Sequence, residues 1–362
     1  MKICLIYVLL LSTSLVAEPS PFNIDTLASG IKIPWGMTWI AQNKLLITQR
    51  GGSIVLLDIV SGKVSPVSGG PKVSAKGQGG LLDVVASPDF KKNGWLYFTY
   101  VKPLTKGGVT VLARAKISSS HAKLNHWQDL VISKSATDTS RHFGSRIAFD
   151  GAEHVFFSIG DRGVRDNAQN TLNHAGAILR LNLDGSVPKD NPFIGQKGYL
   201  PEIYSYGHRN PQGLAFDRAT KQLWAIEHGP RGGDEINLVL AGKNYGWPIT
   251  SHGKEYWGPI GVGEGQTKVG IEAPKKVYIP SIAPSSLLLY QGAAFKKWQG
   301  DLLAGALKLT HINHMQLKAG EPVNERRYLE SHGQRIRNII SDEQGRLIIA
   351  TDSGGILRLS PL

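Results

Sequence analysis

The sequence predicts an all-β protein, a six-bladed β-propeller built of four-stranded antiparallel blades. The first observation is composition, since 42 of the 362 residues are glycine, above the usual share of about 7%. Together with 8 Trp, 11 Tyr and 10 Phe, this indicates many tight turns between short, packed strands. The second observation is internal repetition, with six related segments that begin near residues 35, 81, 146, 213, 287 and 336.

Each repeat contains an apolar strand, a turn with Asp or Gly, a second strand, a polar bend and a third strand. The clearest copies are RIAFDGAEHVFFSIGDRG from Arg146, GLAFDRATKQLWAIEHGP from Gly213 and IRNIISDEQGRLIIATDSGGILRLSP from Ile336. A single blade cannot bury both of its faces, whereas radial packing of six blades can. The last strand, Ile356–Leu359, is expected to pair with an N-terminal strand and close the ring. Two β-sandwiches are the alternative, but no linker or change in composition divides the chain.

The N-terminus has the pattern of a secretory signal. Met1 and Lys2 precede an apolar run, Ile3–Leu11, and the small residue Ala17 comes before a polar segment. We therefore expect a signal peptide over residues 1–17 and a single catalytic propeller domain over 18–362. The only cysteine, Cys4, lies in the part removed. The mature protein is expected to be periplasmic or secreted, without a disulfide or an integral membrane segment.

The formal net charge of +13 favours anionic partners, namely nucleic acid, a membrane surface or a carboxylated small molecule. Basic residues are dispersed and not interleaved with aromatic residues, which argues against nucleic acid. The sequence has no GxxxxGK[ST], no GxGxxG between strand and helix, no CxxC and no HExxH. These absences speak against nucleotide-driven chemistry and zinc hydrolysis.

Two polar segments at strand ends carry candidate catalytic groups. His142, in RHFG, has the ordinary pKa of a base near neutral pH, and Asp161 in the bend IGD is a carboxylate that could hold its tautomer. In GHRNPQG, Arg209 offers a planar fork and Asn210 a directional amide. The alternatives are a structural histidine and a glycine-framed turn with an exposed arginine.

Two further segments suggest ion binding. HGPRGGDE, followed by NYGWP, combines a Gly-Pro bend with nearby carboxylates, an oxygen-rich pattern suited to Ca²⁺. Arg335 and Arg337 lie two apart and share a face if their segment is a strand, and Lys308 adds a third cation. Two guanidinium groups on one face of a core strand require an anion, unless the strand is a solvated edge. Gln78, in a glycine-framed loop, is a further candidate.

These motifs together resemble the soluble, PQQ-dependent aldose sugar dehydrogenases of the glucose and sorbosone dehydrogenase family, where PQQ is pyrroloquinoline quinone. The resemblance covers residues ~22 to 361 in order, and it rests on PWGMTWI, GQGGLLDVVASPDF, RHFGSRIAF, SIGDRG, EIYSYGHRNPQGLAFD, HGPRGGDEINLV, NYGWP, GALK and QRIRNI. It implies a PQQ- and Ca²⁺-dependent oxidation of aldoses at C1 to aldonolactones. Hydride would pass to C5 of the quinone, and electrons would go to an external acceptor such as a quinone, a dye or a redox protein.

The resemblance also assigns roles to single residues. His142 would be the general base, Asp161 would orient it, and Arg209 would polarise the developing oxyanion. The residues implied to hold or line the PQQ site are Gln78, Arg209, Asn210, Tyr256, Lys308, Arg335 and Arg337. The carbonyl groups of Gly229 and Pro230 would bind the Ca²⁺ that grips the quinone, while Glu235 and Tyr245 match ligands of a second, structural Ca²⁺.

This chain departs from the family at Ser145, where relatives often have a second glycine. It is also shorter than the glucose enzyme, which implies a more open substrate cleft in a monomer or homodimer. Two other functions stay open at this point. One is a Ca²⁺-dependent lactonase on a six-bladed propeller, and the other is a non-catalytic propeller that binds a partner protein or a glycan.

Overall fold

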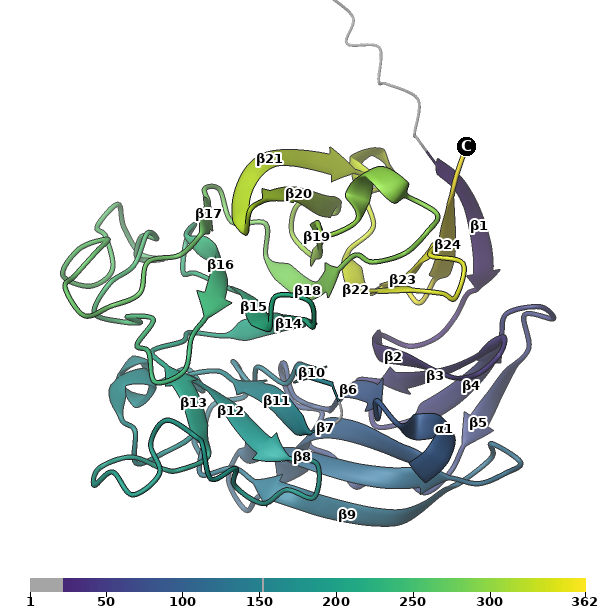
Figure 1. Ribbon diagram of the computed structural model, residues 1–362, viewed down its shortest axis with the longest axis horizontal. Coiled ribbons are helices and arrows are strands. Elements are labelled where there is room, and N and C mark those ends of the chain that lie inside the picture. Colours follow the sequence, from purple (N-terminus) through teal and green to yellow (C-terminus); the bar gives the residue numbers. More distant parts are fainter. Residues whose placement is uncertain (1–21, 152) are drawn as a thin grey trace, which may run out of the picture.

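The computed structural model describes residues 22–151 and 153–362, so the expected signal peptide lies outside the described residues. These residues form six separate four-stranded antiparallel sheets arranged around one axis (Figure 1). The six-bladed propeller predicted from the repeats is therefore confirmed, and the alternative of two sandwiches is excluded. No helix within the described part of the chain has the length and apolar character needed to cross a membrane.

The blades follow one another along the chain. Blades 1 and 2 contain β2 (Pro34–Ala41), β3 (Lys44–Gln49), β4 (Ile54–Asp58), β5 (Val64–Val67), β6 (Leu81–Ala86), β7 (Trp95–Pro103), β8 (Gly108–Ile117) and β9 (Leu124–Ile132). Blades 3 and 4 contain β10 (Ile147–Phe149), β11 (His154–Ile159), β12 (Ala177–Asn182), β13 (Ile203–Tyr206), β14 (Pro211–Asp217), β15 (Gln222–Glu227), β16 (Asp234–Val239) and β17 (Lys276–Tyr278). Blades 5 and 6 contain β18 (Pro284–Leu289), β19 (Leu302–Ala306), β20 (Ile312–Lys318), β21 (Glu321–Tyr328), β22 (Ile336–Ser341), β23 (Leu347–Thr351) and β24 (Ile356–Pro361).

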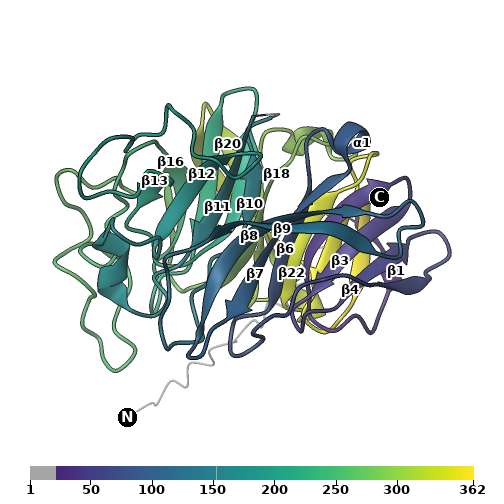
Figure 2. The ribbon, with the colours of Figure 1, turned by 90° about the horizontal axis from the view of Figure 1, so that it is seen from below.

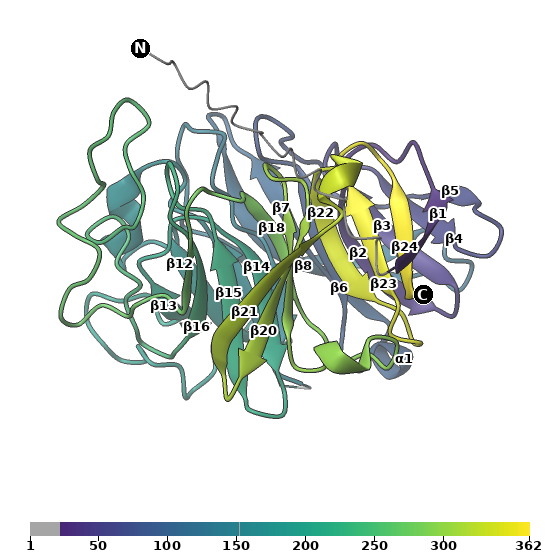
Figure 3. The same cartoon turned by 90° about the horizontal axis from the view of Figure 1, so that it is seen from above.

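The helices are short and lie in the connections. They are α1 (Phe90–Asn93), η1 (Arg165–Gln169), η2 (Lys296–Trp298) and η3 (Glu330–His332). The side views show a flattened body whose inner strands run between its two faces (Figures 2 and 3).

The first described strand, β1 (Phe22–Ala28), completes blade 6. It pairs antiparallel with β24, and Phe22 lies opposite Pro361. Figure 1 shows these two strands side by side although they come from opposite ends of the chain. The predicted closure of the ring by the last strand is confirmed.

The hydrophobic core is divided among the six junctions between blades. Because successive residues of a strand point to opposite faces, neighbouring residues serve different junctions. Leu45 packs towards blade 6 and Leu46 towards blade 2, and the same division separates Leu302 from Leu303. The inner strands are apolar on both faces for this reason, which explains the uninterrupted apolar runs in the repeats.

A buried arginine occupies the centre of the ring. Arg146, just before β10 in blade 3, forms an ion pair with Asp83 of blade 2, with Nη1 and Oδ1 3.1 Å apart. Its guanidinium also lies 3.9 Å above the Trp35 ring. It donates hydrogen bonds to the carbonyl oxygens of Trp35, Gln212, Ser285 and Arg337, which belong to blades 1, 4, 5 and 6. One side chain thus connects all six inner strands.

Candidate active site

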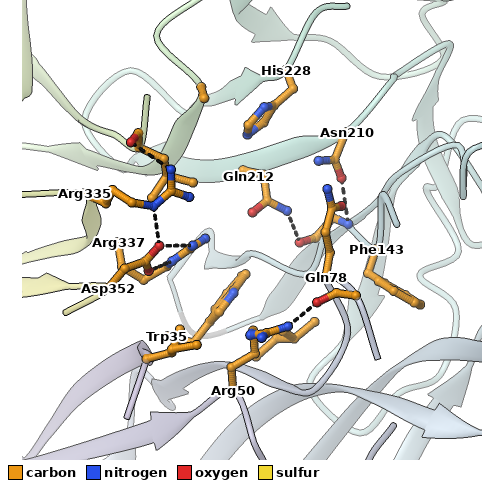
Figure 4. A pocket seen from close by; sticks show the side chains of 16 residues that line it. Trp35, Arg50, Gln78, Phe143, Asn210, Gln212, His228, Arg335, Arg337 and Asp352 are labelled. Atoms are coloured by element: carbon orange, nitrogen blue, oxygen red, sulfur yellow. Dashed lines mark hydrogen bonds and ion pairs between the residues drawn. The ribbon is translucent and has the colours of Figure 1, made fainter. Parts of the chain in front are cut away.

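A cavity of about 350 Å³ opens at one mouth of the ring. In an antiparallel blade, the start of the innermost strand and the end of the second strand lie at the same edge. The cavity is lined by residues from these two positions: Ile33, Trp35, Arg50, Gly77, Gln78, Leu82, Phe143, Gly144, Asn210, Gln212, His228, Ala283, Leu307, Arg335, Arg337 and Asp352. Figure 4 shows the polar side chains of this set converging from several blades.

His142 and Asp161 lie together beside this cavity. His142 Nδ1 is 2.7 Å from Asp161 Oδ1, and Trp247 Nε1 donates to Asp161 Oδ2 at 2.7 Å. The backbone N–H of Gly163 donates to the same carboxylate at 2.6 Å. With Nδ1 held by a carboxylate, Nε2 is the basic nitrogen of His142. The predicted proximity of His142 and Asp161 is present, and it gives the imidazole a fixed orientation beside the cavity.

The backbone that carries His142 is strained and held by two predicted cofactor residues. His142 has a φ of 56° and Ser145 a φ of 87°, values that favour glycine. Gln78 Oε1 accepts a hydrogen bond from the N–H of His142 at 2.7 Å, and Asn210 Oδ1 accepts one from Gly144 at 3.1 Å. Strained backbone held from outside is typical of functional sites.

Electrostatics keep His142 neutral at neutral pH. Burial lowers the pKa of His142 below 6.5, and the nearby Arg209 adds to this effect, while Asp161 opposes it. Burial alone would raise the pKa of Asp161, but the hydrogen bond from His142 and the positive charge of Arg209 hold it below its usual value. His228, which lines the cavity, is buried near Arg209 and His142, and its pKa falls to about 3. Burial, with Arg209 as a smaller cause, therefore favours the uncharged form of both imidazoles.

Arg209 lies between the histidines and the outer loop. Its Nη1 donates to the carbonyl oxygen of His228 at 3.2 Å, and its Nη2 to the hydroxyl of Tyr256 at 3.4 Å. Its guanidinium lies 5.2 Å from the Trp247 ring. The Nε atom is buried and has no hydrogen-bond partner among the described residues. A buried guanidinium with an unused donor fits a site that receives an oxygen atom from a ligand.

The cationic wall of the cavity comes from blade 6. Arg337 donates to both oxygens of Asp352, at 2.7 and 2.9 Å, and Arg335 Nε donates to Asp352 Oδ2 at 2.9 Å (Figure 4). The expected anion for these cations is thus supplied in part by the chain itself. Lys308 follows Leu307 but is exposed, and it is not among the residues that line the cavity.

A second, much smaller cavity of about 10 Å³ is lined by Arg209 and shares His228 with the first, and its volume is about that of one water molecule. Gly229, Glu235 and Tyr245 line it together with Glu227, whereas Pro230 does not. Burial and the neighbouring Glu227 raise the pKa of Glu235 to about 8. Within the described residues, no Lys or Arg side chain forms an ion pair with either carboxylate, and Glu227 Oε1 lies 2.8 Å from His208 Nδ1. Two buried carboxylates in this arrangement fit a small cation.

Several site residues were not identified from sequence. They are Asp352, Trp247, Trp35, Glu227 and Arg50. A signal for Asp352 was available, because it follows the second strand of its repeat just as Asp161 follows the second strand of the repeat from Arg146. Trp247 lies in the NYGWP segment, but nothing local indicates that its indole reaches Asp161, 86 residues away in the chain.

Comparisons with known proteins show relatives of this chain and of its fold. Residues 31–358 match the family model described as Glucose / Sorbosone dehydrogenase. The chain is 38% identical to the aldose sugar dehydrogenase YliI of Escherichia coli, covering 99% of this chain and 98% of that protein.

Two solved structures are similar over most of the chain. The soluble aldose sugar dehydrogenase of Escherichia coli, in its apo-form, has a TM-score of 0.90 at 37% identity, covering 94% of this chain and 100% of that chain. The PQQ-bound form of an aldose sugar dehydrogenase from Streptomyces coelicolor has a TM-score of 0.77 at 25% identity, covering 95% and 99%. From its motifs, its fold and the family model that spans nearly all of it, this chain belongs to the glucose and sorbosone dehydrogenase family.

Proposed function

We propose that this protein is a PQQ- and Ca²⁺-dependent dehydrogenase that oxidises aldoses at C1 to aldonolactones and passes the electrons to an external acceptor. The observation that carries the proposal is the oriented His142–Asp161 pair beside a cavity walled by arginines. The named relatives support the same reaction class. A lactonase would not require the cationic wall, and a non-catalytic propeller would not require a histidine held as a base.

The cavity residues fit an anionic, planar cofactor. PQQ carries three carboxylates, and Arg335 and Arg337 keep unused N–H groups beyond those bound by Asp352. Trp35 and Phe143 supply apolar surface, while Gln78 and Asn210 supply amides. A volume of about 350 Å³ lies within the range of cofactor pockets, about 300–1,000 Å³. When bound, PQQ supplies the hydride acceptor at its quinone C5.

The reaction needs a base and a group that stabilises negative charge. His142 takes the proton of the sugar C1 hydroxyl on Nε2, since Asp161 occupies Nδ1. Asp161 and Trp247 hold the imidazole in position and stabilise the imidazolium that results. Arg209 stabilises the charge that develops on the C1 oxygen, and its buried Nε is the available donor.

The chain also offers two places for Ca²⁺. The carbonyl groups of Gly229 and Pro230 would hold the ion next to the cofactor, where it would polarise the quinone. Glu235 and Tyr245, with Glu227, would hold a structural ion in the small cavity. The hydroxyl of Tyr245 already donates to Leu238 O at 2.6 Å and accepts from Leu240 at 2.8 Å, so its backbone carbonyl is the available ligand.

Two implied cofactor residues lie at the edge of the site. Tyr256 reaches it through its hydroxyl contact with Arg209, although its side chain is 64% exposed. Lys308 is exposed beside the cavity, and we propose that its flexible side chain turns inward towards a carboxylate of PQQ.

The test uses the purified full-length apo-protein mixed with PQQ and Ca²⁺, a panel of aldoses and an acceptor dye. Sugar-dependent dye reduction that disappears without PQQ is expected. His142→Ala should bind PQQ as the parent does yet lose about 10²–10⁴-fold in turnover. The matched control is His126→Ala, an exposed histidine on the outermost strand β9, which should retain full activity. Absence of both PQQ binding and dye reduction in the parent protein would reject the proposal and favour a lactonase assay.

A further inference from the structure

We propose that Arg50 is a further residue of the cofactor site, with two roles. Its free N–H groups bind an anionic group of the cofactor, and its Nη1 fixes the loop that positions His142. This inference rests on the function proposed above. It adds a cation from blade 1, which neighbours the blade that carries Arg335 and Arg337, and Trp35 is drawn between them (Figure 4).

The backbone of Arg50 is tied into the ring at the end of β3. Its N–H donates to the carbonyl oxygen of Ile33 at 3.1 Å, and its own carbonyl accepts from Leu81 at 3.1 Å. These bonds link the first strands of blades 1 and 2. The side chain therefore starts from a rigid position and extends along the cavity wall.

The guanidinium holds a glycine-rich loop. Arg50 Nη1 donates to the carbonyl oxygen of Gly77 and, at 3.4 Å, to that of Gly79. Between these glycines lies Gln78, whose side-chain oxygen accepts from the N–H of His142 and whose own N–H donates to Ser140 at 2.8 Å. Arg50 is thus two contacts away from the base.

The loop has no room to shift between these partners. A Cβ on Gly77 would lie 2.4 Å from the carbonyl oxygen of Ser140, and one on Gly80 would lie 1.9 Å from that of Arg50. Because the loop is close-packed on both sides, movement of Arg50 reaches Gln78 and then the strained backbone of His142. This contact chain gives Arg50 its positioning role.

The charges in the cavity point to an anion at Arg50. The cavity wall holds three guanidinium groups, of Arg50, Arg335 and Arg337, and one carboxylate, of Asp352. Asp352 is bound by the two blade 6 arginines. Within residues 22–151 and 153–362, Arg50 has no carboxylate within 4.0 Å, and its Nε and Nη2 make no hydrogen bond. A half-buried guanidinium group with two unpaired nitrogen donors is suited to bind a carboxylate.

The experiment compares Arg50→Gln, Arg50→Lys and the parent protein, with Arg218→Gln as the control on an exposed turn. PQQ binding to the apo-protein is titrated by its absorbance at low and high salt, and turnover is then measured at saturating PQQ. Arg50→Gln is expected to weaken binding about tenfold or more and to reduce the salt dependence of binding. Arg50→Lys keeps the positive charge but lacks the planar guanidinium group. It should therefore keep most of the parent's affinity for PQQ but lose turnover.

The outcomes separate the two roles and the two proposals. Unchanged affinity in Arg50→Gln would overturn the anion-binding role, and full turnover in Arg50→Lys would overturn the positioning role. If Arg50→Gln does not fold, Arg50→Met, which removes the charge but keeps an unbranched side chain, is titrated with PQQ instead, and unchanged affinity in it would overturn the anion-binding role. Failure of the parent protein to bind PQQ would instead reject the proposed function itself.

Discussion

Arginine meets aspartate at two places along the axis of the propeller, and the two clusters behave as opposites. At the centre, the Arg146 and Asp83 side chains are only 5% and 6% exposed, and carbonyl groups of four blades accept the hydrogen bonds of Arg146. At the mouth, Arg335 is 52% exposed, and it shares Asp352 with Arg337. The first cluster has most of its donors satisfied within the protein, whereas the second keeps N–H groups without a partner among the described residues.

The two arginine–aspartate clusters show that residue type alone does not decide whether a charged side chain is structural or functional. What decides is how completely its hydrogen bonds are satisfied by the fold. Arg146 holds the ring together because each of the other five blades offers it a carbonyl or a carboxylate at the axis. Arg335 and Arg337 lie where the ring opens and only one internal anion reaches them.

The largest effect is expected at the centre. Arg146→Met should lower the free energy of unfolding by about 3–5 kcal/mol, because it leaves Asp83 buried without its counterion and several carbonyls unpaired. Urea unfolding measures this change. Arg358→Met, which breaks the exposed pair with Asp25, is the control and should cost less than about 1 kcal/mol. If Arg146→Met lowered the free energy of unfolding by less than about 1 kcal/mol, the distinction between the two clusters would be wrong.

The mouth should respond more in affinity for PQQ than in stability. Arg335→Gln combined with Arg337→Gln should weaken PQQ binding by about 100-fold or more, since two charge-assisted contacts are lost. The free energy of unfolding of the apo-protein should fall by less than in Arg146→Met, because Asp352, which loses both partners, is 17% exposed whereas Asp83 is 6% exposed. Arg327→Gln, a similarly exposed arginine of blade 5, is the matched control. A large loss of stability with unchanged affinity would show that the mouth cluster is structural like the centre.

The pH dependence of turnover tests the electrostatic environment of His142 at the mouth. His142 must be neutral to accept a proton, and burial followed by the charge of Arg209 lowers its pKa below 6.5. The rate should therefore hold constant as pH falls from 7 and decline only below about 6.5, with a single protonation. A profile of kcat/KM against pH measures it. A midpoint above 6.5 would mean that the Asp161 carboxylate outweighs the burial and the mouth cations.

The smallest expected effect concerns Ser145, a serine with a positive φ three residues after His142. Its φ of 87° is strained for serine, although its hydroxyl donates to Phe143 O at 3.0 Å. Ser145→Gly should raise stability by less than about 1 kcal/mol, since relief of strain exceeds the lost hydrogen bond. Thermal unfolding tests this. Gly144→Ala should act in the opposite direction, because its Cβ would lie 2.7 Å from Ser158 O.

Much of the fold was predictable because each blade repeats a local pattern. The expected starts near residues 35, 213 and 287 compare with observed inner strands that begin at Pro34, Pro211 and Pro284. The outermost strands had no such signal. For example, β21 reads EPVNERRY and is largely exposed, so it lacks the apolar pattern that marks an inner strand.

The candidate site was predictable to the level of motifs. The residues of RHFG, GDRG, GHRN and QRIR do meet at one mouth, because their strand-end positions recur from blade to blade. Asp352 and Arg50 were not identified, since each has an ordinary turn around it and its importance depends on a partner from another segment. The motif GALK also gives no indication that Lys308 lies outside the cavity lining.

The sequence by itself determined the strands, their order and the closure of the ring, because alternation and turn residues act between near neighbours in the chain. Only the tertiary structure decided which charges meet. Arg146 reaches a carbonyl 191 residues away, and Gln78 reaches His142 across 64 residues. The pairing of buried charges depends on such long-range contacts. These contacts satisfy the arginine at the centre of the propeller and leave N–H groups of the arginines at its mouth unpaired.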